Sequence, residues 1–258
     1  MRFDRKGVLV VFSGPSGVGK GTVRKRFFEK MGDKLYYSIS MTTRAMREGE
    51  KNGVDYHFVS REKFLREIKN DNVLEYNEYV GNFYGTPKDI VFEKINKGID
   101  VVLEIEVNGA KIIKEKVPNC VSIFIAPPGF GTLKERLIGR NTETVDIIEE
   151  RLKKAKEEIA CAGDYDYIVI NDDIEEASDE VISIIESEHL RVDRVFADYY
   201  KQLNIDEKDW FWRNIWLITI KLRLNKLKNF GTELECIILQ QNGNLVLLKK
   251  KLKKFLST

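Results

Sequence analysis

The sequence predicts an α/β fold in which helices flank a parallel β-sheet, and two observations carry this prediction. The run Val8 to Phe12 is apolar at every position, as in a strand that is buried on both faces of a parallel sheet. Beyond it, short β-type runs alternate with helical patterns up to about residue 200, the order that parallel strands joined by helices require. A chain of 258 residues suffices for one large domain or two small ones.

The first elements surround a glycine-rich loop. After this loop, apolar residues recur at helical spacing up to Met31, and Gly32 is expected to end the helix. Tyr36 to Ser40 predicts a second short strand. Ser60 is expected to cap a helix with one apolar face. The loop therefore lies between a buried strand and an amphipathic helix.

The later elements repeat this alternation. Thr86 as N-cap and Pro87 in the first turn predict a helix from Lys88 to Lys97, which Gly98 would end. Three more strands are expected at Val101 to Glu106, Val121 to Ala126 and Tyr167 to Ile170. Three more helices are expected at Leu133 to Gly139, from a Thr144 cap through Cys161, and near Ser178 to Tyr200.

Composition excludes several protein classes. With 43% hydrophobic and 33% charged residues and five prolines, the chain is neither collagen-like nor wholly disordered. Three widely spaced cysteines give no disulfide framework, and two histidines, His57 and His189, exclude a His-rich metal site. The apolar stretch near the N-terminus is too short for a signal peptide, and no run is long enough to span a membrane. We expect a cytoplasmic protein.

The last 55 residues differ from the rest in charge. Asn204 to Thr258 contains eleven Lys or Arg and five Asp or Glu, which gives +6 and leaves −4 for the preceding residues. This basic segment includes Trp210, Trp212 and Trp216, and two apolar runs flank Asn242-Gly243, a hairpin signal. Contact with a membrane surface or nucleic acid, docking, self-association and disorder all remain open, and an accessory extension of unknown role is preferred.

The strongest chemical signal is the loop Gly14-Pro15-Ser16-Gly17-Val18-Gly19-Lys20, which matches the G-x-x-x-x-G-K phosphate loop. Glycines allow backbone N–H groups to converge on an anion, and Lys20 can reach the phosphates. A tight turn with an incidental lysine is the alternative. Gly21 stands where the motif usually has Ser or Thr, and the hydroxyl follows as Thr22, a candidate contact to Mg²⁺.

Further blocks, in order along the chain, resemble the bacterial guanylate kinase family. After the loop come Ser40 to Glu50 and Gly53 to Tyr56, then Glu75. The later blocks are Gly81 to Thr86, Leu103 to Glu106, Ala126 to Pro128, Gly139 to Glu143 and Asn171 to Asp173. The resemblance covers roughly residues 6 to 200. It implies transfer of the γ-phosphoryl group of ATP to GMP with Mg²⁺, giving ADP and GDP in purine nucleotide metabolism.

The resemblance also implies a P-loop kinase core, an inserted and mostly β GMP-binding region, and a helical lid. The kinase domain would span residues 1–203. Its core would be 6–37, 88–126 and 162–200, the GMP-binding region 38–87, and the lid about 127–161. Residues 204–258 lie outside the resemblance. Asn141 and Gly129 depart from the family's usual Gly and Ser in the lid.

Candidate site residues follow from chemistry and resemblance together. Arg44 and Arg47 carry forked donors that suit a monophosphate, although a solvated basic loop would look the same. A carboxylate at Glu75 can accept both the N1–H and the amino group of guanine. The resemblance gives further GMP contacts to Ser40, Glu50, Tyr56, Tyr84, Thr86, Glu104 and Glu106.

On the ATP side, the resemblance assigns the loop from Gly14 to Thr22, and Asn171 beside the adenine, where a turn or cap asparagine is the alternative. Catalytic roles fall to Lys20, Arg44, Arg136, Arg140 and Arg151, although ordinary helix-surface arginines would show the same spacing. The histidines are expected to be structural.

Two other functions compete with GMP phosphorylation. A guanylate-kinase-like binding module would keep the fold but characteristically loses loop and acceptor residues that are present here. A kinase for another small phosphorylated acceptor would not require Glu75. No nucleic-acid partner is expected, and the sequence does not distinguish a monomer from a homo-oligomer.

Overall fold

The computed structural model describes residues 6–138, 145–202, 238–241 and 244–247. The chain divides into two units, Met1–Phe196 and Ala197–Thr258. The first unit contains a five-stranded sheet of order β2-β7-β1-β8-β9 and a four-stranded sheet of order β4-β3-β6-β5. Among the described residues, no helix is long and apolar enough to cross a membrane.

All neighbouring strands of the five-stranded sheet are parallel, as predicted. Its strands are β1 (Leu9–Ser13), β2 (Leu35–Tyr37), β7 (Asp100–Glu104), β8 (Val121–Ala126) and β9 (Tyr167–Ile170). β8 and β9 have the predicted bounds. β2 ends three residues earlier than expected, and β7 ends two residues earlier because Glu106 is already the N-cap of the next helix.

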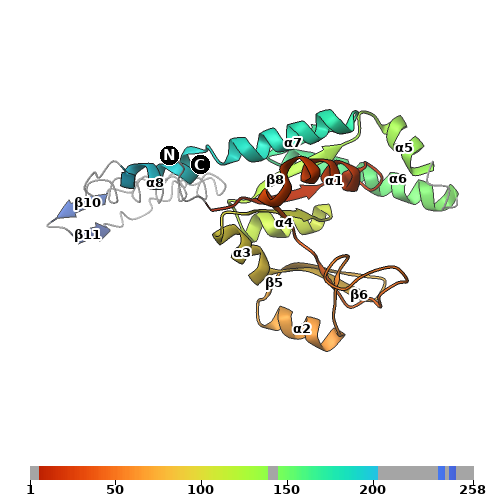
Figure 1. The fold of residues 1–258 in the computed structure, drawn as a ribbon, viewed down its shortest axis with the longest axis horizontal. Helices are drawn as coiled ribbons and strands as arrows, with labels where there is room; N and C mark the ends of the chain where they lie inside the picture. Colours follow the sequence, from red (N-terminus) through yellow and green to blue (C-terminus); the bar gives the residue numbers. More distant parts are fainter. Residues whose placement is uncertain (1–5, 139–144, 203–237, 242–243, 248–258) are drawn as a thin grey trace, which may run out of the picture. The chain divides into compact units, whose positions relative to one another are not determined.

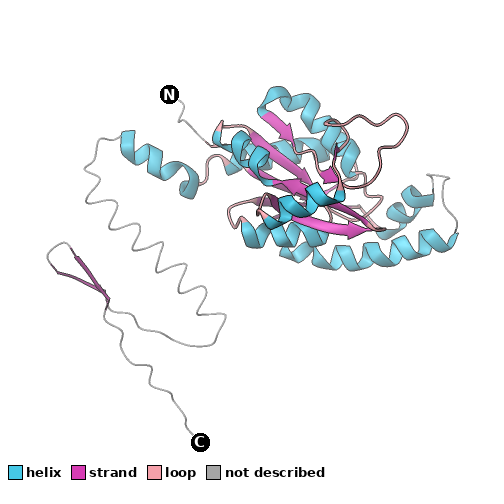
Figure 2. Cartoon of the chain, turned by 90° about the horizontal axis from the view of Figure 1, so that it is seen from below, coloured by secondary structure: helices cyan, strands magenta, loops and turns pink. Residues whose placement is uncertain are grey.

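Helices cover both faces of this sheet, as Figure 2 shows. They are α1 (Lys20–Met31), α3 (Lys88–Asn96), α4 (Val107–Lys116), α5 (Phe130–Ile138), α6 (Val145–Ala160) and α7 (Ile174–Glu188), with 3₁₀ turns at Gly32–Lys34 and Cys161–Asp164. A further helix, α8 (Val192–Gln202), follows α7 and does not cover the sheet. Val10 and Phe12 of β1 pack in the core with α1, α5, α6 and α7. Leu9 and Val11 pack with α3 and α4 on the other face. β1 is therefore buried on both faces, as its apolar run predicts.

Two element predictions are wrong, and one helix was not predicted. Thr86 is not the N-cap of α3: Pro87 holds that position, and Thr86 lies in a strand, where its hydroxyl donates to a carboxylate of the site. The single helix expected near Ser178 to Tyr200 is two helices, α7 and α8. The ten-residue helix α4 was not predicted from the sequence.

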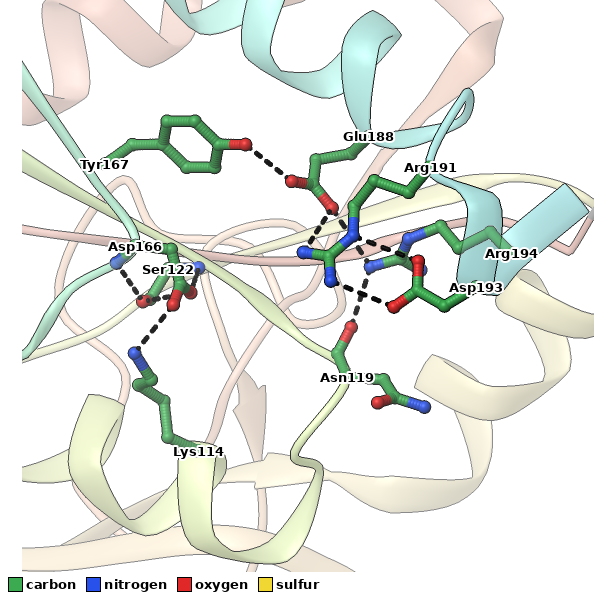
Figure 3. A network of polar contacts seen from close by, with 9 residues as sticks. All are labelled: Lys114, Asn119, Ser122, Asp166, Tyr167, Glu188, Arg191, Asp193 and Arg194. Carbon is green, nitrogen blue, oxygen red and sulfur yellow. Dashed lines mark hydrogen bonds and ion pairs between the residues drawn. The ribbon is translucent and has the colours of Figure 1, made fainter. Parts of the chain in front are cut away.

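The break between α7 and α8 coincides with a network of polar contacts (Figure 3). Glu188, the last residue of α7, is 1% exposed and accepts a hydrogen bond of 2.6 Å from the hydroxyl of Tyr167. Arg194 of α8 donates to the same carboxylate and to the backbone oxygen of Asn119. Arg191 forms a two-point pair with Asp193 in the turn. These contacts hold the first turn of α8 near the starts of β8 and β9.

The four-stranded sheet lies beside the parallel sheet with one helix against it (Figure 1). Its elements are β3 (Met41–Thr42), β4 (His57–Phe58), α2 (Arg61–Lys69), β5 (Val73–Tyr79) and β6 (Asn82–Pro87). Ser60 caps α2 as predicted, accepting from the Lys63 amide. β5 pairs with β6 through a register shift between Val73 and Tyr76. Glu75 lies within that irregularity, which re-aims side chains locally.

The second unit contains the predicted hairpin. β10 (Ile238–Gln241) pairs antiparallel with β11 (Asn244–Leu247), in register from Ile238 with Leu247 to Gln241 with Asn244. The turn Asn242-Gly243 and the tryptophan-rich and lysine-rich segments of the extension lie outside the described residues.

Candidate active site

The glycine-rich loop leads from β1 into α1, as the sequence predicts. A side chain is disfavoured at three of its glycines, Gly14, Gly17 and Gly19, each of which has a positive φ and a close neighbour. Gly17 has φ +85° and a Cβ there would lie 2.6 Å from the Leu137 side chain, whereas Gly19 has φ +96° and a Cβ would lie 2.7 Å from the Asn171 amide. Positive φ and close packing both require glycine. The loop is thus wrapped tightly at the N-terminus of α1, where helix amides attract anions.

Lys20 points back across this loop. Its ammonium donates to the backbone oxygens of Gly14 and Pro15 at 2.6 and 3.0 Å. Burial lowers the pKa of Lys20, and the carboxylates of Glu104, Glu158 and Glu106 oppose that effect. A cation held in this way is placed to neutralise a phosphate bound in the loop.

A carboxylate already contacts the loop. Oε2 of Glu158, on α6, accepts a hydrogen bond of 3.2 Å from the backbone N–H of Ser16. Burial raises the pKa of Glu158. Residue spacing does not indicate this contact, because 142 positions separate Glu158 from Ser16.

Asn171 and Arg136 hold the other side of the loop. The Asn171 amide donates to the Val18 oxygen at 2.7 Å, and Arg136 donates to the Val18 and Asn171 oxygens at 3.2 and 3.0 Å. Asn171 is buried directly after β9. Arg136 and Asn171, which were both predicted to lie on the ATP side, therefore contact the phosphate loop or the residue beside it.

A cavity of about 430 Å³ opens between the two sheets. Every residue predicted to contact GMP lines it except Thr86, which lies behind Glu75. The lining residues are Ser40, Arg44, Arg47, Glu50, Tyr56, Glu75, Asn77, Tyr79, Tyr84, Gly85, Glu104, Ile105, Glu106 and Gly109. Of these, Asn77, Tyr79 and Gly109 were missed because they lie outside the motif blocks. Gly85 and Ile105 lie within two of those blocks but were given no role. We call this space the arginine–glutamate cavity.

Arg44 is fixed at one wall of the arginine–glutamate cavity. Its guanidinium donates to both carboxylate oxygens of Glu50, at 2.7 and 3.1 Å, and it lies 5.5 Å from the centre of the Tyr56 ring. Glu50 also accepts from the Arg47 amide at 2.7 Å. The Glu50 contact raises the pKa of Arg44, and Arg44 lowers the pKa of Glu50. Glu50 thus orients the arginine, whose remaining donors can bind an anion.

Glu75 places a buried carboxylate in the wall of the arginine–glutamate cavity. It is 7% exposed, and Oε1 accepts a hydrogen bond of 2.7 Å from the Thr86 hydroxyl. Gly109 of α4 lies against the other oxygen, because a Cβ there would be 3.1 Å from Oε2. Burial raises the pKa of Glu75. A buried carboxylate with spare acceptor capacity suits a ligand that brings two N–H donors.

The phosphate loop and the cavity meet at the end of β7. Glu104 lines the cavity, accepts from Arg24 of α1 at 2.7 Å and acts electrostatically on Lys20. Arg24 in turn stacks over the Tyr37 ring at 4.0 Å. Glu106 also lines the cavity and pairs with Lys154 of α6 at 3.4 Å. A molecule in the cavity and one in the loop would therefore be neighbours.

The remaining predicted residues are less fully described. Arg140 lies outside the described residues, as does Thr144. Arg151 lies on α6, and Thr22 is exposed in the first turn of α1. Among the residues that the structure describes, no group of three or more His, Cys, Asp or Glu side chains is arranged to hold a metal ion.

Comparison with known proteins agrees with this geometry. The guanylate kinase family model matches residues 6–188. Curated guanylate kinases from Streptococcus thermophilus and Streptococcus mutans are 53% and 54% identical over 201 residues, which is 78% of this chain and 96% of each relative. The crystal structure of guanylate kinase from Anaplasma phagocytophilum matches with a TM-score of 0.60 at 38% identity, covering 75% of this chain and 92% of that one. The chain belongs to the guanylate kinase family.

Proposed function

We propose that this chain transfers the γ-phosphoryl group of ATP to GMP, giving ADP and GDP, and so contributes to the supply of GTP. The observation that carries the proposal is the buried Glu75 facing a cavity that also contains Arg44 and Arg47 and adjoins the phosphate loop. A nucleotide with a monophosphate at one end and two N–H donors at the other matches these groups.

The chemistry requires two polyanions to meet in line. In this proposal the loop from Gly14 to Thr22 holds the ATP phosphates, with Lys20 at the transferring group. Arg44 and Arg47 hold the GMP phosphate, while Tyr56 and Tyr84 add neutral donors. Arg136, Arg140 and Arg151 stabilise charge that develops on the phosphoryl group. Asn171, which holds the loop through Val18, is proposed to lie beside the adenine.

Guanine selection belongs to Glu75, supported by Thr86 and Gly109. The carboxylate accepts both the N1–H and the amino group, a pair of donors that adenine lacks. Ser40, Glu104 and Glu106 complete the contacts in this proposal. Because burial already disfavours the charge on Glu75, a phosphate acceptor without these N–H donors would leave the carboxylate with only the Thr86 hydroxyl as donor, which weakens binding strongly.

We further propose that Mg²⁺ accompanies ATP. Mg²⁺ usually keeps several waters and takes phosphate oxygens with one or two protein ligands, so a site without a cluster of carboxylates fits it. Thr22 and, through water, Glu104 are the candidate protein contacts. The ion would neutralise charge on the phosphates. Both substrates are metabolites of the cytoplasm, where we propose the protein acts.

We propose that three regions of the chain perform these tasks. We propose residues 38–87 as the GMP-binding region, about 127–161 as the lid, and 6–37, 88–126 and 162–200 as the core of a domain that ends at 203. The retained loop, arginines and Glu75 favour an enzyme over a binding module.

The test is an assay of ADP release from ATP with GMP, AMP, CMP or UMP as acceptor, on the full chain. We expect turnover with GMP alone. Lys20→Ala should reduce kcat by at least about a hundredfold, because it removes a charge that stabilises the transferred group. Lys25→Ala, an exposed lysine on the same helix, is the matched control. Equal turnover in the Lys20 and Lys25 variants would contradict the assignment of the loop.

A further inference from the structure

Glu158 reaches from α6 into the phosphate loop. The residue lies near the C-terminal end of α6 (Val145–Ala160), and its Oε2 accepts from the Ser16 N–H at 3.2 Å. The side chain is 11% exposed, so the contact is shielded from water. A carboxylate oxygen therefore already accepts a hydrogen bond from the loop. In loops of this kind, the backbone N–H groups bind phosphate oxygens.

The charges around this carboxylate fall into two sets. Lys154, one turn earlier on α6, lies 3.8 Å from Oε1 of Glu158 and also pairs with Glu106 at 3.4 Å. Lys20 acts on Glu158 from the loop, and Tyr165 lies near enough for its pKa to be affected by Glu158. Burial and Glu106 raise the pKa of Glu158, whereas the Ser16 amide, Lys154 and Lys20 lower it. The carboxylate is thus held by cations that a phosphate would also attract.

A polyphosphate and this carboxylate compete for the same place. One N–H group makes one strong hydrogen bond, so Ser16 cannot serve both oxygens fully. Two anions at hydrogen-bond range in a shielded site repel each other strongly. We propose that Glu158 occupies a phosphate-binding position of the loop in the nucleotide-free protein and that ATP has to displace it, so that Glu158 sets the affinity for ATP.

This inference rests on the proposed function for the identity of the nucleotide. The proposal predicts an effect on ATP binding and none on GMP binding. ATP binding includes the cost of moving Glu158 from Ser16, whereas GMP enters the arginine–glutamate cavity, which Glu158 does not line. Neutralising Glu158 should therefore improve ATP binding and leave GMP binding unchanged.

The experiment compares Glu158→Gln with Glu157→Gln in the full chain. Glu157 is the exposed neighbour on the same helix, so the two variants remove the same charge. ATP binding is measured by calorimetry, which needs no turnover, and KM values for ATP and GMP are measured by ADP release. We expect Glu158→Gln to lower the Kd for ATP by about three- to tenfold, the scale of a charge-assisted hydrogen bond partly replaced by a neutral one. Glu157→Gln should match wild type, and KM for GMP should not change.

A pH series adds a second readout. As pH falls from neutral to mildly acidic, Glu158 with its raised pKa becomes protonated and ceases to compete. The ratio of wild-type to Glu158→Gln Kd values should then approach one. Using the ratio of the two Kd values cancels the titration of ATP itself, which is common to both measurements.

An unchanged or weaker ATP affinity in Glu158→Gln would overturn the proposal and make Glu158 a support of the loop. A fall in kcat without a change in Kd would also overturn it. If Glu158→Gln does not fold, as judged by circular dichroism, Glu158→Asp carries the same test, because the shorter side chain withdraws from Ser16. ATP binding without GMP turnover would reject the proposed function alone, while absence of ATP binding in all variants would reject both.

Discussion

Glu75 shows how a single residue can be placed for recognition at the expense of stability. It is buried, and the Thr86 hydroxyl is one donor to a group that can accept several. Its pKa is raised, so the folded protein binds this proton more tightly than the unfolded chain does. The stability contribution of the group is therefore full below the unfolded-state pKa and is lost as pH rises through the folded-state pKa.

Glu75→Gln should consequently have opposite effects on folding and on substrate binding. At neutral pH we expect the free energy of unfolding to rise by about 1 kcal/mol, because a buried charge is removed while an acceptor for Thr86 remains. KM for GMP should rise by at least about tenfold, since one of two guanine donors loses its acceptor. Urea unfolding and steady-state kinetics measure the two quantities.

The pH dependence provides the control for this prediction. In the wild-type protein, KM for GMP should rise as pH falls through the raised pKa of Glu75, because the protonated acid accepts less well. Glu75→Gln should lack that component. A variant that is less stable than wild type at neutral pH would contradict the reading of Glu75 as a destabilising buried charge.

At the scale of elements, the turn between β5 and β6 contains a conformational conflict. Val80 and Gly81 connect the paired residues Tyr79 and Asn82, and both have positive φ, +48° and +71°. A two-residue hairpin of this kind favours Asn-Gly. Valine is branched at Cβ, so it is strained there. Its side chain is 79% exposed and gains little from packing.

Val80→Asn should raise the free energy of unfolding by about 1 kcal/mol, because asparagine tolerates the left-handed conformation. Chemical denaturation measures the change. Val54→Asn is the matched control, since Val54 is also exposed, at 62%, but is not among the non-glycine residues with positive φ. An equal gain in both variants would attribute the effect to surface polarity rather than to the turn.

The elements also show what local sequence can and cannot predict. Apolar runs located β1 and β8, because burial on both faces leaves a signal at nearly every position. β9 was also found from an apolar run, although Ile168 and Ile170 are exposed in this edge strand. The break between α7 and α8 has no Gly or Pro, and it depends on contacts of Glu188 with Tyr167 and Arg194, which sequence spacing does not reveal. Thr86 looked like a helix cap, and its actual partner, Glu75, is fixed by strand pairing.

The residues of the candidate site also differ in whether local sequence or tertiary contacts reveal them. The loop and Lys20 are contiguous in sequence and were found from the motif, whereas the resemblance supplied most residues of the arginine–glutamate cavity. Glu158 and Arg24 were missed, because each acts on a partner at least 80 residues away. Such pairs depend on how helices pack on the sheet, a tertiary property that residue spacing does not carry.

At the scale of the whole molecule, the C-terminal extension lies beyond the part of the chain that the family model matches. The Streptococcus guanylate kinases match over 201 residues that make up 96% of their length, and the family match ends at residue 188. The basic, tryptophan-containing residues 204–258 lie after the end of the family match.

A chain that ends at Leu203 should keep kcat and both KM values within about twofold of the full chain, because every proposed site residue lies before that point. ADP release with GMP measures this directly. Loss of turnover in a truncated protein that is folded by circular dichroism would give the extension a part in catalysis.

The contacts in Figure 3 determine where the first turn of α8 is attached to the parallel sheet. Ser122 and Tyr167 stand at the beginnings of β8 and β9, whereas the phosphate loop follows the end of the parallel strand β1. Arg194 ties the last helix to the backbone of Asn119, at the edge of the sheet remote from the loop. The part of α8 that carries Arg194 is therefore anchored at the opposite ends of the parallel strands from the phosphate loop, so a reporter attached at this anchor would lie away from bound phosphates.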